Sequence, residues 1–144
     1  MKELRTDIDI YGTIDQVWDV LTDFSSFPKW NPFIKKIEGE LKLNSQLRVQ
    51  IEPPGGKAMT FKPTVKILEP KNEFRWLGSL LLPGIFDGEH IFQLEQIDNN
   101  NTRFIHSENF SGLLVPLFWK SLNTQTRNGF EEMNKALKKK VESI

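Results

Sequence analysis

The longest hydrophobic pattern in the chain is helical and lies at the C-terminus. After Pro116 the sequence contains no further proline and one glycine, Gly129. Apolar side chains recur there at helical spacing and form one stripe: Phe118, Leu122, Phe130, Met133, Leu137, Val141 and Ile144. The pattern predicts a helix over about 113–144, with Pro116 in its first turn. One step of the stripe falls on Thr126, beside Gly129, so we expect a cavity next to the middle of this helix.

Most of the remaining chain alternates between apolar and polar residues with a period of two, which is typical of half-buried strands. Such segments lie at about 4–10, 33–41, 47–51, 61–67, 74–77, 88–97 and 102–110. Pro63 cannot donate a ladder hydrogen bond, so we expect it at a sheet edge or bulge. Two short helices are predicted after the first strand, and Thr13 with Gln16 has the pattern of a capping box. This order favours an α+β fold in which a curved antiparallel sheet grips the long helix around a pocket.

The segment from Leu80 to Phe86 is apolar but contains a Pro-Gly pair, which makes it a poor strand. We expect it to form a flap over the cavity entrance, with a loop packed onto its own core as the alternative. The predicted entrance residues are Leu81, Leu82, Phe86 and Trp30.

Composition limits the function classes. The 144 residues are predicted to form one domain over 1–144, with 38% hydrophobic and 26% charged residues. Nineteen basic and nineteen acidic side chains balance, which argues against nucleic-acid binding. The chain has no cysteine, no apolar run long enough to cross a membrane and no N-terminal signal pattern, so we expect a cytoplasmic protein. As a separate expectation, we take it to be a monomer or a weak homodimer. Eleven Phe and four Trp provide large flat surfaces to bury or to offer to a ligand.

Three polar residues lie on the apolar faces of two neighbouring predicted strands. His90 alternates in step with Phe92, and His106 and Glu108 alternate in step with Phe104 and Phe110. For the two inner faces to coincide, paired residue numbers in the hairpin must have an even sum, either 198 or 200. Both registers place His90, His106 and Glu108 within roughly 5–8 Å of one another.

Four interpretations of this cluster remain open. In the order in which the residues favour them, they are a hydrogen-bonded patch in a cavity wall, a site that orients the polar group of an apolar ligand, a general acid–base pair, and a metal site of two His and one carboxylate. No nucleophile accompanies the cluster, and i, i+2 spacing on a strand is a weak metal signal. We therefore name no firm catalytic residue and expect neither a metal nor a cofactor.

Four segments resemble the START-like (SRPBCC) superfamily, in its polyketide cyclase/dehydrase and lipid-transport branch. They are 17–24 (VWDVLTDF), 30–34 (WNPFI), 88–95 (GEHIFQLE) and 102–114 (TRFIHSENFSGLL). The resemblance implies the helix-grip fold, a seven-stranded antiparallel sheet wrapped around the C-terminal helix with an apolar cavity between them. It implies small-molecule binding more firmly than any reaction, because the superfamily includes carriers, receptors, cyclases and oxygenase domains.

We therefore expect a protein that binds a hydrophobic or amphipathic molecule, lipid-like or polyketide-like, in an internal cavity. The alternatives are a cyclase or dehydratase that uses the His/Glu cluster, and an interaction module whose cavity is only a packing defect. The expected ligand-binding residues are His90, Phe92, His106, Glu108, Trp76, Phe61, Thr126, Phe130 and Leu122.

Overall fold

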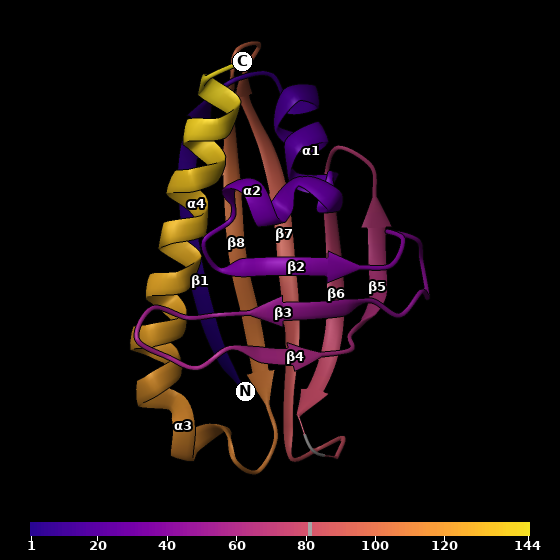
Figure 1. The fold of residues 1–144 in the computed structure, drawn as a ribbon, viewed down its shortest axis with the longest axis vertical. Helices are drawn as coiled ribbons and strands as arrows, with labels where there is room; N and C mark the ends of the chain where they lie inside the picture. The colour runs from indigo at the N-terminus through magenta and orange to yellow at the C-terminus, as the bar shows by residue number, and fades with distance from the viewer. Residues whose placement is uncertain (81) are drawn as a thin grey trace.

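The structure is a computed structural model that describes residues 1–80 and 82–144. Its strands are β1 (Lys2–Tyr11), β2 (Ile34–Glu38), β3 (Arg48–Ile51), β4 (Met59–Phe61), β5 (Thr64–Glu69), β6 (Glu73–Leu80), β7 (Phe86–Asp98) and β8 (Asn101–Ser111). Its helical elements are α1 (Ile14–Thr22), the 3₁₀ turn η1 (Phe24–Ser26), α2 (Phe27–Trp30), α3 (Val115–Ser121), the π-helical segment η2 (Leu122–Thr126) and α4 (Arg127–Glu142). The predicted α+β fold, with a long C-terminal helix gripped by antiparallel strands, is confirmed (Figure 1).

The strands form two antiparallel sheets. Five long strands follow the order β1-β8-β7-β6-β5, and the shorter strands follow the order β2-β3-β4. In Figure 1, β2, β3 and β4 run across the front of the long strands, and α4 lies along β1. An isolated bridge between Gln46 and Thr64 and the Leu47 N to Pro63 O hydrogen bond (2.8 Å) join the two sheets. The interior lies between the sheets and the helix.

The predicted number of strands was wrong: the described part of the chain has eight strands, where seven were expected. The difference arises at Pro63, within the segment that was predicted to be a single strand over 61–67. Here β4 ends at Phe61 and β5 begins at Thr64, so that each strand belongs to a different sheet. Proline has no N–H for a ladder bond, which explains why the strand is divided at this position.

Local hydrogen bonds fix the two short helices that follow β1. The predicted capping box is present at the start of α1, where Gln16 N donates to Thr13 Oγ1 (3.2 Å) and Thr13 N donates to Gln16 Oε1 (2.9 Å). After α2, the buried Asn31 accepts from the N–H groups of Phe33 and Ile34 through its side-chain oxygen. This turn directs Phe33 into the interior.

The C-terminal helix is continuous from Val115 to Glu142, because the residues that join α3, η2 and α4 keep right-handed helical dihedrals. Its buried stripe is Phe130, Met133, Leu137 and Val141, all in α4. The two ends of the predicted stripe are not buried, since Phe118 is 46% and Ile144 72% exposed. The π-helical segment coincides with the interruption in the stripe, and such segments are frequent at functional sites.

Gly129 allows Phe33, the residue just before β2, to approach the helix closely. A Cβ atom at this position would overlap the aromatic ring of Phe33. Phe33 therefore packs against the helix backbone, and its ring lies 5.5 Å from the ring of Phe130 in an edge-to-face arrangement. A glycine is required here for close approach, even though it weakens a helix interior.

Candidate functional site

An internal cavity of about 90 Å³ lies beside η2, bounded by β3, β4, β6, β7 and β8. Its apolar lining is Phe33, Ile51, Met59, Phe61, Leu80, Phe86, Phe110 and Leu122. The remaining lining residues are Gly78, Ser79, Gly88, His90, Glu108 and Thr126. A cavity of roughly 150 Å³ holds a benzene molecule. The cavity as it stands therefore suits a small guest, and a larger guest requires its walls to move.

Six of the predicted site residues meet at this cavity. They are Phe61, Phe86, His90, Glu108, Leu122 and Thr126. The others behave differently: Trp76, Phe92, His106 and Phe130 are at most 1% exposed and lie behind the cavity wall. These buried aromatic rings form a solid core in which Phe74 stacks on Phe92 at 4.4 Å between ring centroids.

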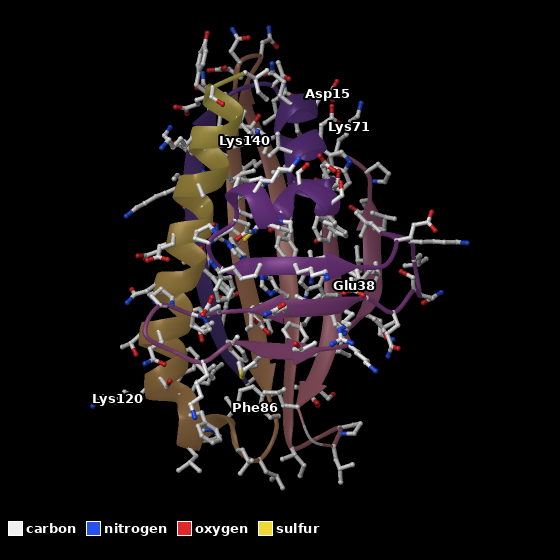
Figure 2. All side chains as sticks on the ribbon, viewed as in Figure 1. Asp15, Glu38, Lys71, Phe86, Lys120 and Lys140 are labelled. Carbon is white, nitrogen blue, oxygen red and sulfur yellow. The ribbon has the colours of Figure 1, made fainter. Side chains whose placement is uncertain are left out.

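The predicted entrance residues separate in space. Phe86 lines the cavity, at the same end of the molecule as α3 (Figure 2). Its ring centroid is 6.0 Å from that of Phe118 in α3. Trp30 packs against Phe27 and does not line the cavity. Leu82 is 70% exposed in the turn after β6, and Leu81 lies outside the described residues. The flap assigned to 80–86 thus remains a prediction.

The hairpin register agrees with the first of the two predicted alternatives. In the β7–β8 pair, His90 lies opposite Glu108 and Phe92 lies opposite His106, so the paired numbers sum to 198. Near the turn a bulge between Gln96 and Asp98 shifts the register by one residue. The three polar residues consequently share one inner face, as the alternation predicted.

These residues form a polar network in which Thr6, His90, His106 and Asn134 are buried and Glu108, at the cavity, has a side chain that is 16% exposed. The Nε2 atoms of His90 and His106 are 2.6 Å apart, and His106 Nδ1 is 2.8 Å from Asn134 Oδ1. Asn134 Nδ2 donates to Thr6 Oγ1 (2.9 Å), and Thr6 Oγ1 donates to the backbone oxygen of His106 (2.8 Å). At the cavity end, His90 Nδ1 faces Glu108 Oε1 at 3.6 Å, which is too long for a hydrogen bond.

The imidazole rings of the network lie among aromatic rings. His90 stacks on Phe92 with 4.3 Å between ring centroids, and His106 stacks on Phe130 with 4.0 Å between centroids. Both histidines are buried, and their polar contacts are with each other and with the network. Stacking and hydrogen bonding together hold each ring in one orientation.

Burial shifts the pKa values of the network toward uncharged forms. Loss of water lowers the pKa of His90 well below its usual value, and a charge on His106 would lower it further. Loss of water also lowers the pKa of His106 to about 3, although hydrogen bonds to Asn134 and to the Phe130 backbone act in the opposite sense. Burial raises the pKa of Glu108 to about 8. At neutral pH these shifts favour the protonated form of Glu108 and the neutral forms of both imidazoles.

The space for the Glu108 carboxyl group depends on Gly88 on the neighbouring strand. A Cβ atom at Gly88 would collide with Glu108 Oε2. The glycine therefore lets the carboxyl group lie against the β7 backbone at the cavity wall. Because Gly88 also lines the cavity, this part of the wall consists of the Gly88 backbone and the carboxyl group of Glu108.

Sequence reasoning did not identify Asn134 and Thr6 as members of the network. A signal was present for each: Asn134 follows Phe130 by four residues on the buried face of α4, and Thr6 alternates in step with Leu4 and Ile10. A polar residue at a buried position usually has a hydrogen-bond partner, but the pattern does not say which. The cavity-lining residues Phe33, Ile51, Met59, Gly78, Ser79, Leu80, Gly88 and Phe110 were also not predicted.

Across residues 1–80 and 82–144, no group of three or more His, Cys, Asp or Glu side chains is arranged to hold a metal ion. In the same residues, no helix is long and apolar enough to cross a membrane.

A long helix gripped by antiparallel strands, with an apolar cavity between them, defines the START-like class of proteins. The chain belongs to the family described as polyketide cyclase/dehydrase and lipid transport, whose model matches residues 1–142. Comparison with curated protein sequences finds no match.

Solved structures with the same fold are similar over nearly the whole chain. A START superfamily protein from Mycobacterium smegmatis is 20% identical, with a TM-score of 0.77 and coverage of 98% of this chain and 97% of that one. The Zhui aromatase/cyclase from Streptomyces sp. R1128 is 15% identical, with a TM-score of 0.80 and coverage of 98% and 93%. A hypothetical protein from Helicobacter pylori is 19% identical, with a TM-score of 0.80 and coverage of 97% and 88%.

Proposed function

We propose that this protein binds a hydrophobic or amphipathic small molecule in the cavity beside η2. The observation that carries the proposal is the distribution of side chains around the cavity. Most of the lining is apolar, while His90 and Glu108 lie together at one part of the wall. Pockets for small molecules typically combine an apolar lining with a few polar groups that orient the ligand. The family, which includes lipid transport in its description, supports the same function.

The size of the cavity bears on the kind of guest. At about 90 Å³ it is small for a lipid chain or a polycyclic molecule. A larger guest would have to displace wall residues that are already partly exposed. Met59 is 41% exposed, and Phe86 and Leu122 are half-buried. We propose that these residues move when a larger molecule enters, which leaves the solid core around Phe92 unchanged.

An enzymatic function of the cyclase or dehydratase type is the second candidate. It is favoured by Glu108, whose pKa is raised by burial to about 8 and whose carboxyl group lies at the cavity wall 3.6 Å from His90 Nδ1. A carboxylic acid with a raised pKa is suited to donate a proton to a carbonyl or hydroxyl oxygen of a substrate. The family description includes cyclases and dehydrases, and the Zhui protein is an aromatase/cyclase.

Thr126→Leu tests the binding function, because the added carbon atoms would occupy the cavity beside η2. We expect this variant to fold normally and to bind small aromatic compounds at least about tenfold more weakly. For the unmodified protein, a ligand at 100 times its Kd should stabilise the fold by about 2.7 kcal/mol, as measured by thermal unfolding. Thr124→Leu is the matched control, since Thr124 is exposed in the same π-helical segment and does not line the cavity.

Four outcomes separate the candidates. Stabilisation by ligands that is lost in Thr126→Leu but kept in Thr124→Leu supports binding in the cavity. Equal loss in both variants would contradict that location. If no compound in a broad panel stabilises the protein, the cavity is a packing defect and the binding function is rejected. Conversion of a bound polyketide-like compound, lost in Glu108→Gln, would favour the enzyme.

A further inference from the structure

The polar network has a defined direction, because it ends on a group that can only accept. That group is the backbone oxygen of His106, which accepts the Thr6 hydroxyl hydrogen at 2.8 Å. With its hydrogen committed, Thr6 Oγ1 can only accept from the neighbouring Asn134 side chain. The atom of Asn134 that faces Thr6 is therefore the NH₂ nitrogen, at 2.9 Å, and the amide oxygen faces His106.

The same reasoning assigns the hydrogens on both histidines. His106 Nδ1 must carry a hydrogen to donate to Asn134 Oδ1 at 2.8 Å. In the neutral ring, His106 Nε2 then has a lone pair, so His90 Nε2 must donate across the 2.6 Å contact. His90 Nδ1 is left with a lone pair directed toward Glu108. A backbone carbonyl far from the cavity thus decides what His90 presents there.

This arrangement leaves two uncharged groups at the cavity wall. The Nδ1–Oε1 separation of 3.6 Å is longer than the 2.7–2.9 Å typical of a charge-assisted hydrogen bond, as an ionised Glu108 paired with a protonated His90 would form. The wall therefore offers the carboxylic acid hydrogen of Glu108 as a donor and the lone pair of His90 Nδ1 as an acceptor.

Charged groups on the surrounding elements point elsewhere. Lys2 of β1 lies 5.6 Å above the ring of Trp119. Arg127 of α4 donates to the backbone oxygen of Arg5. Asp87 of β7 accepts from Ser79 of β6. Among the described residues that line the cavity, His90 and Glu108 are the titratable ones, and neither Lys nor Arg is present.

We propose that the cavity selects guests that carry an uncharged oxygen, a hydroxyl or a carbonyl, and rejects carboxylates and ammonium groups. This inference rests on the proposed binding function and names its ligand class. A carbonyl oxygen accepts from Glu108; a hydroxyl group accepts from Glu108 and also donates to His90 Nδ1. A carboxylate would lose its hydration without meeting a cation, and an ammonium group would lose its hydration without meeting an anion. Asn134 and Thr6 act as positioning residues, since they set the tautomers from behind the wall.

Because the pKa of Glu108 is raised to about 8, ligand binding should depend on pH. Below this pKa the carboxyl group is protonated and donates to the guest. Above it this donor is lost. Of the two hydroxyl groups that line the cavity, that of Ser79 donates to Asp87 (2.6 Å), and that of Thr126 is a weaker donor than a carboxylic acid. Binding of a ketone should therefore weaken as the pH rises through about 8, whereas an alcohol can still donate its own hydrogen to the ionised carboxylate.

A series of small benzene derivatives tests the ligand class, because its members share one ring. Toluene, benzyl alcohol, acetophenone, benzoate and benzylammonium would be titrated at pH 6.5 with NMR detection. We expect the alcohol and the ketone to bind at least about tenfold more tightly than benzoate and benzylammonium, and more tightly than toluene. From pH 6.5 to 9.5, acetophenone should lose about tenfold in affinity and benzyl alcohol less. In Glu108→Gln, which keeps an uncharged donor at every pH, the pH dependence for acetophenone should disappear.

Tautomers are read directly from long-range ¹H–¹⁵N spectra of the histidines. We expect hydrogen on Nδ1 of His106 and on Nε2 of His90. Thr6→Val removes the hydroxyl group that orients Asn134, with little change in shape, so the fraction of this tautomer pair should fall. The same variant should reduce the affinity for benzyl alcohol relative to acetophenone, because the alcohol donates to His90 Nδ1 and the ketone does not, although Thr6 does not line the cavity.

Failure of the inference differs from failure of the binding function. If none of the five compounds binds, both are overturned. Binding without discrimination, or a preference for benzoate, overturns the ligand class and leaves the binding function intact. The opposite tautomers in the unmodified protein, or selectivity that Thr6→Val does not change, would overturn the positioning roles of Thr6 and Asn134.

Discussion

The two halves of the C-terminal helix face the same interior but differ in how closely they pack against it. The α4 half buries Phe130, Met133, Asn134, Leu137 and Val141 against the sheet. The α3–η2 half buries Val115 alone among its residues, and Leu122 and Thr126 border the cavity. One half is a solid core and the other is a wall, although the helix is continuous.

The difference between the halves shows how a folded chain keeps a cavity open. Large residues at every step of a helical stripe would close the interior, as they do in α4. In the middle of the helix, the side chain of Thr126 is too small to fill the interior. The π-helical segment adds a residue to one turn, so the side chains on either side of it point in different directions. Gly129 next to it admits Phe33, which seals the cavity from the solid half. The solid core and the cavity wall are thereby assigned to different turns of one element.

Phe130→Ala should have the largest effect on stability. Phe130 is fully buried between Phe33 and His106, so its removal should leave a void and lower the free energy of unfolding by about 3–5 kcal/mol. Leu122→Ala on the cavity wall is the matched control and should cost less than about 1.5 kcal/mol, because this side chain already borders empty space. Urea denaturation measures both. Equal losses would show that the two halves are packed alike.

The pH dependence of stability should reveal the uncharged network, with Glu108 acting on the alkaline side. Its folded-state pKa of about 8 lies above the usual 4.5, so the stability it contributes is present below pH 4.5 and is lost as the pH rises through 8. Glu108→Gln cannot ionise. The free energy of unfolding of this variant relative to the unmodified protein should therefore rise between pH 4.5 and 8, by about 2–4 kcal/mol, and then level off.

His106 should act with the opposite sign. Its folded-state pKa of about 3 lies below the usual 6.5, so its contribution is present above pH 6.5 and is lost as the pH falls through 3. His106→Phe should consequently gain stability relative to the unmodified protein only on the acid side. Denaturant unfolding across pH 4–9 measures both variants. A constant offset at every pH for either variant would mean that its side chain titrates alike in the folded and unfolded states.

Gly129→Ala should have a smaller effect and tests the boundary between the halves. Alanine favours a helix over glycine by about 1 kcal/mol, but its Cβ atom would overlap the Phe33 ring. We expect a net loss of about 1–2 kcal/mol, because Phe33 is buried and cannot move freely. Asn128→Ala, at an exposed position of the same helix, should be neutral or slightly stabilising. Thermal unfolding checks the pair, and a stabilising Gly129→Ala would show that Phe33 can shift at no cost.

Local periodicity predicted a large part of the fold. Alternation placed the strands and the helical stripe placed the long helix, because both patterns depend on residues that are neighbours along the chain. The parity of the β7–β8 hairpin allowed two registers, and one of them, with His90 opposite Glu108, is the observed one. The interruption at Thr126 also predicted where the helix borders a cavity.

Only the tertiary structure decided which inward-facing residues meet the cavity and which form the solid core. Trp76 and Phe92 point inward from their strands as His90 does, and Phe130 lies on the buried face of α4, yet all three are buried behind the cavity wall. Whether an inward side chain of a long strand reaches the cavity depends on which residues of β2–β4 and of the helix pack over it. These contacts join residues that are far apart in sequence. Asn134 and Thr6 illustrate this most clearly, since 128 positions separate them and one hydrogen bond joins them. Sequence determined the faces of the elements, and long-range packing determined what each face touches.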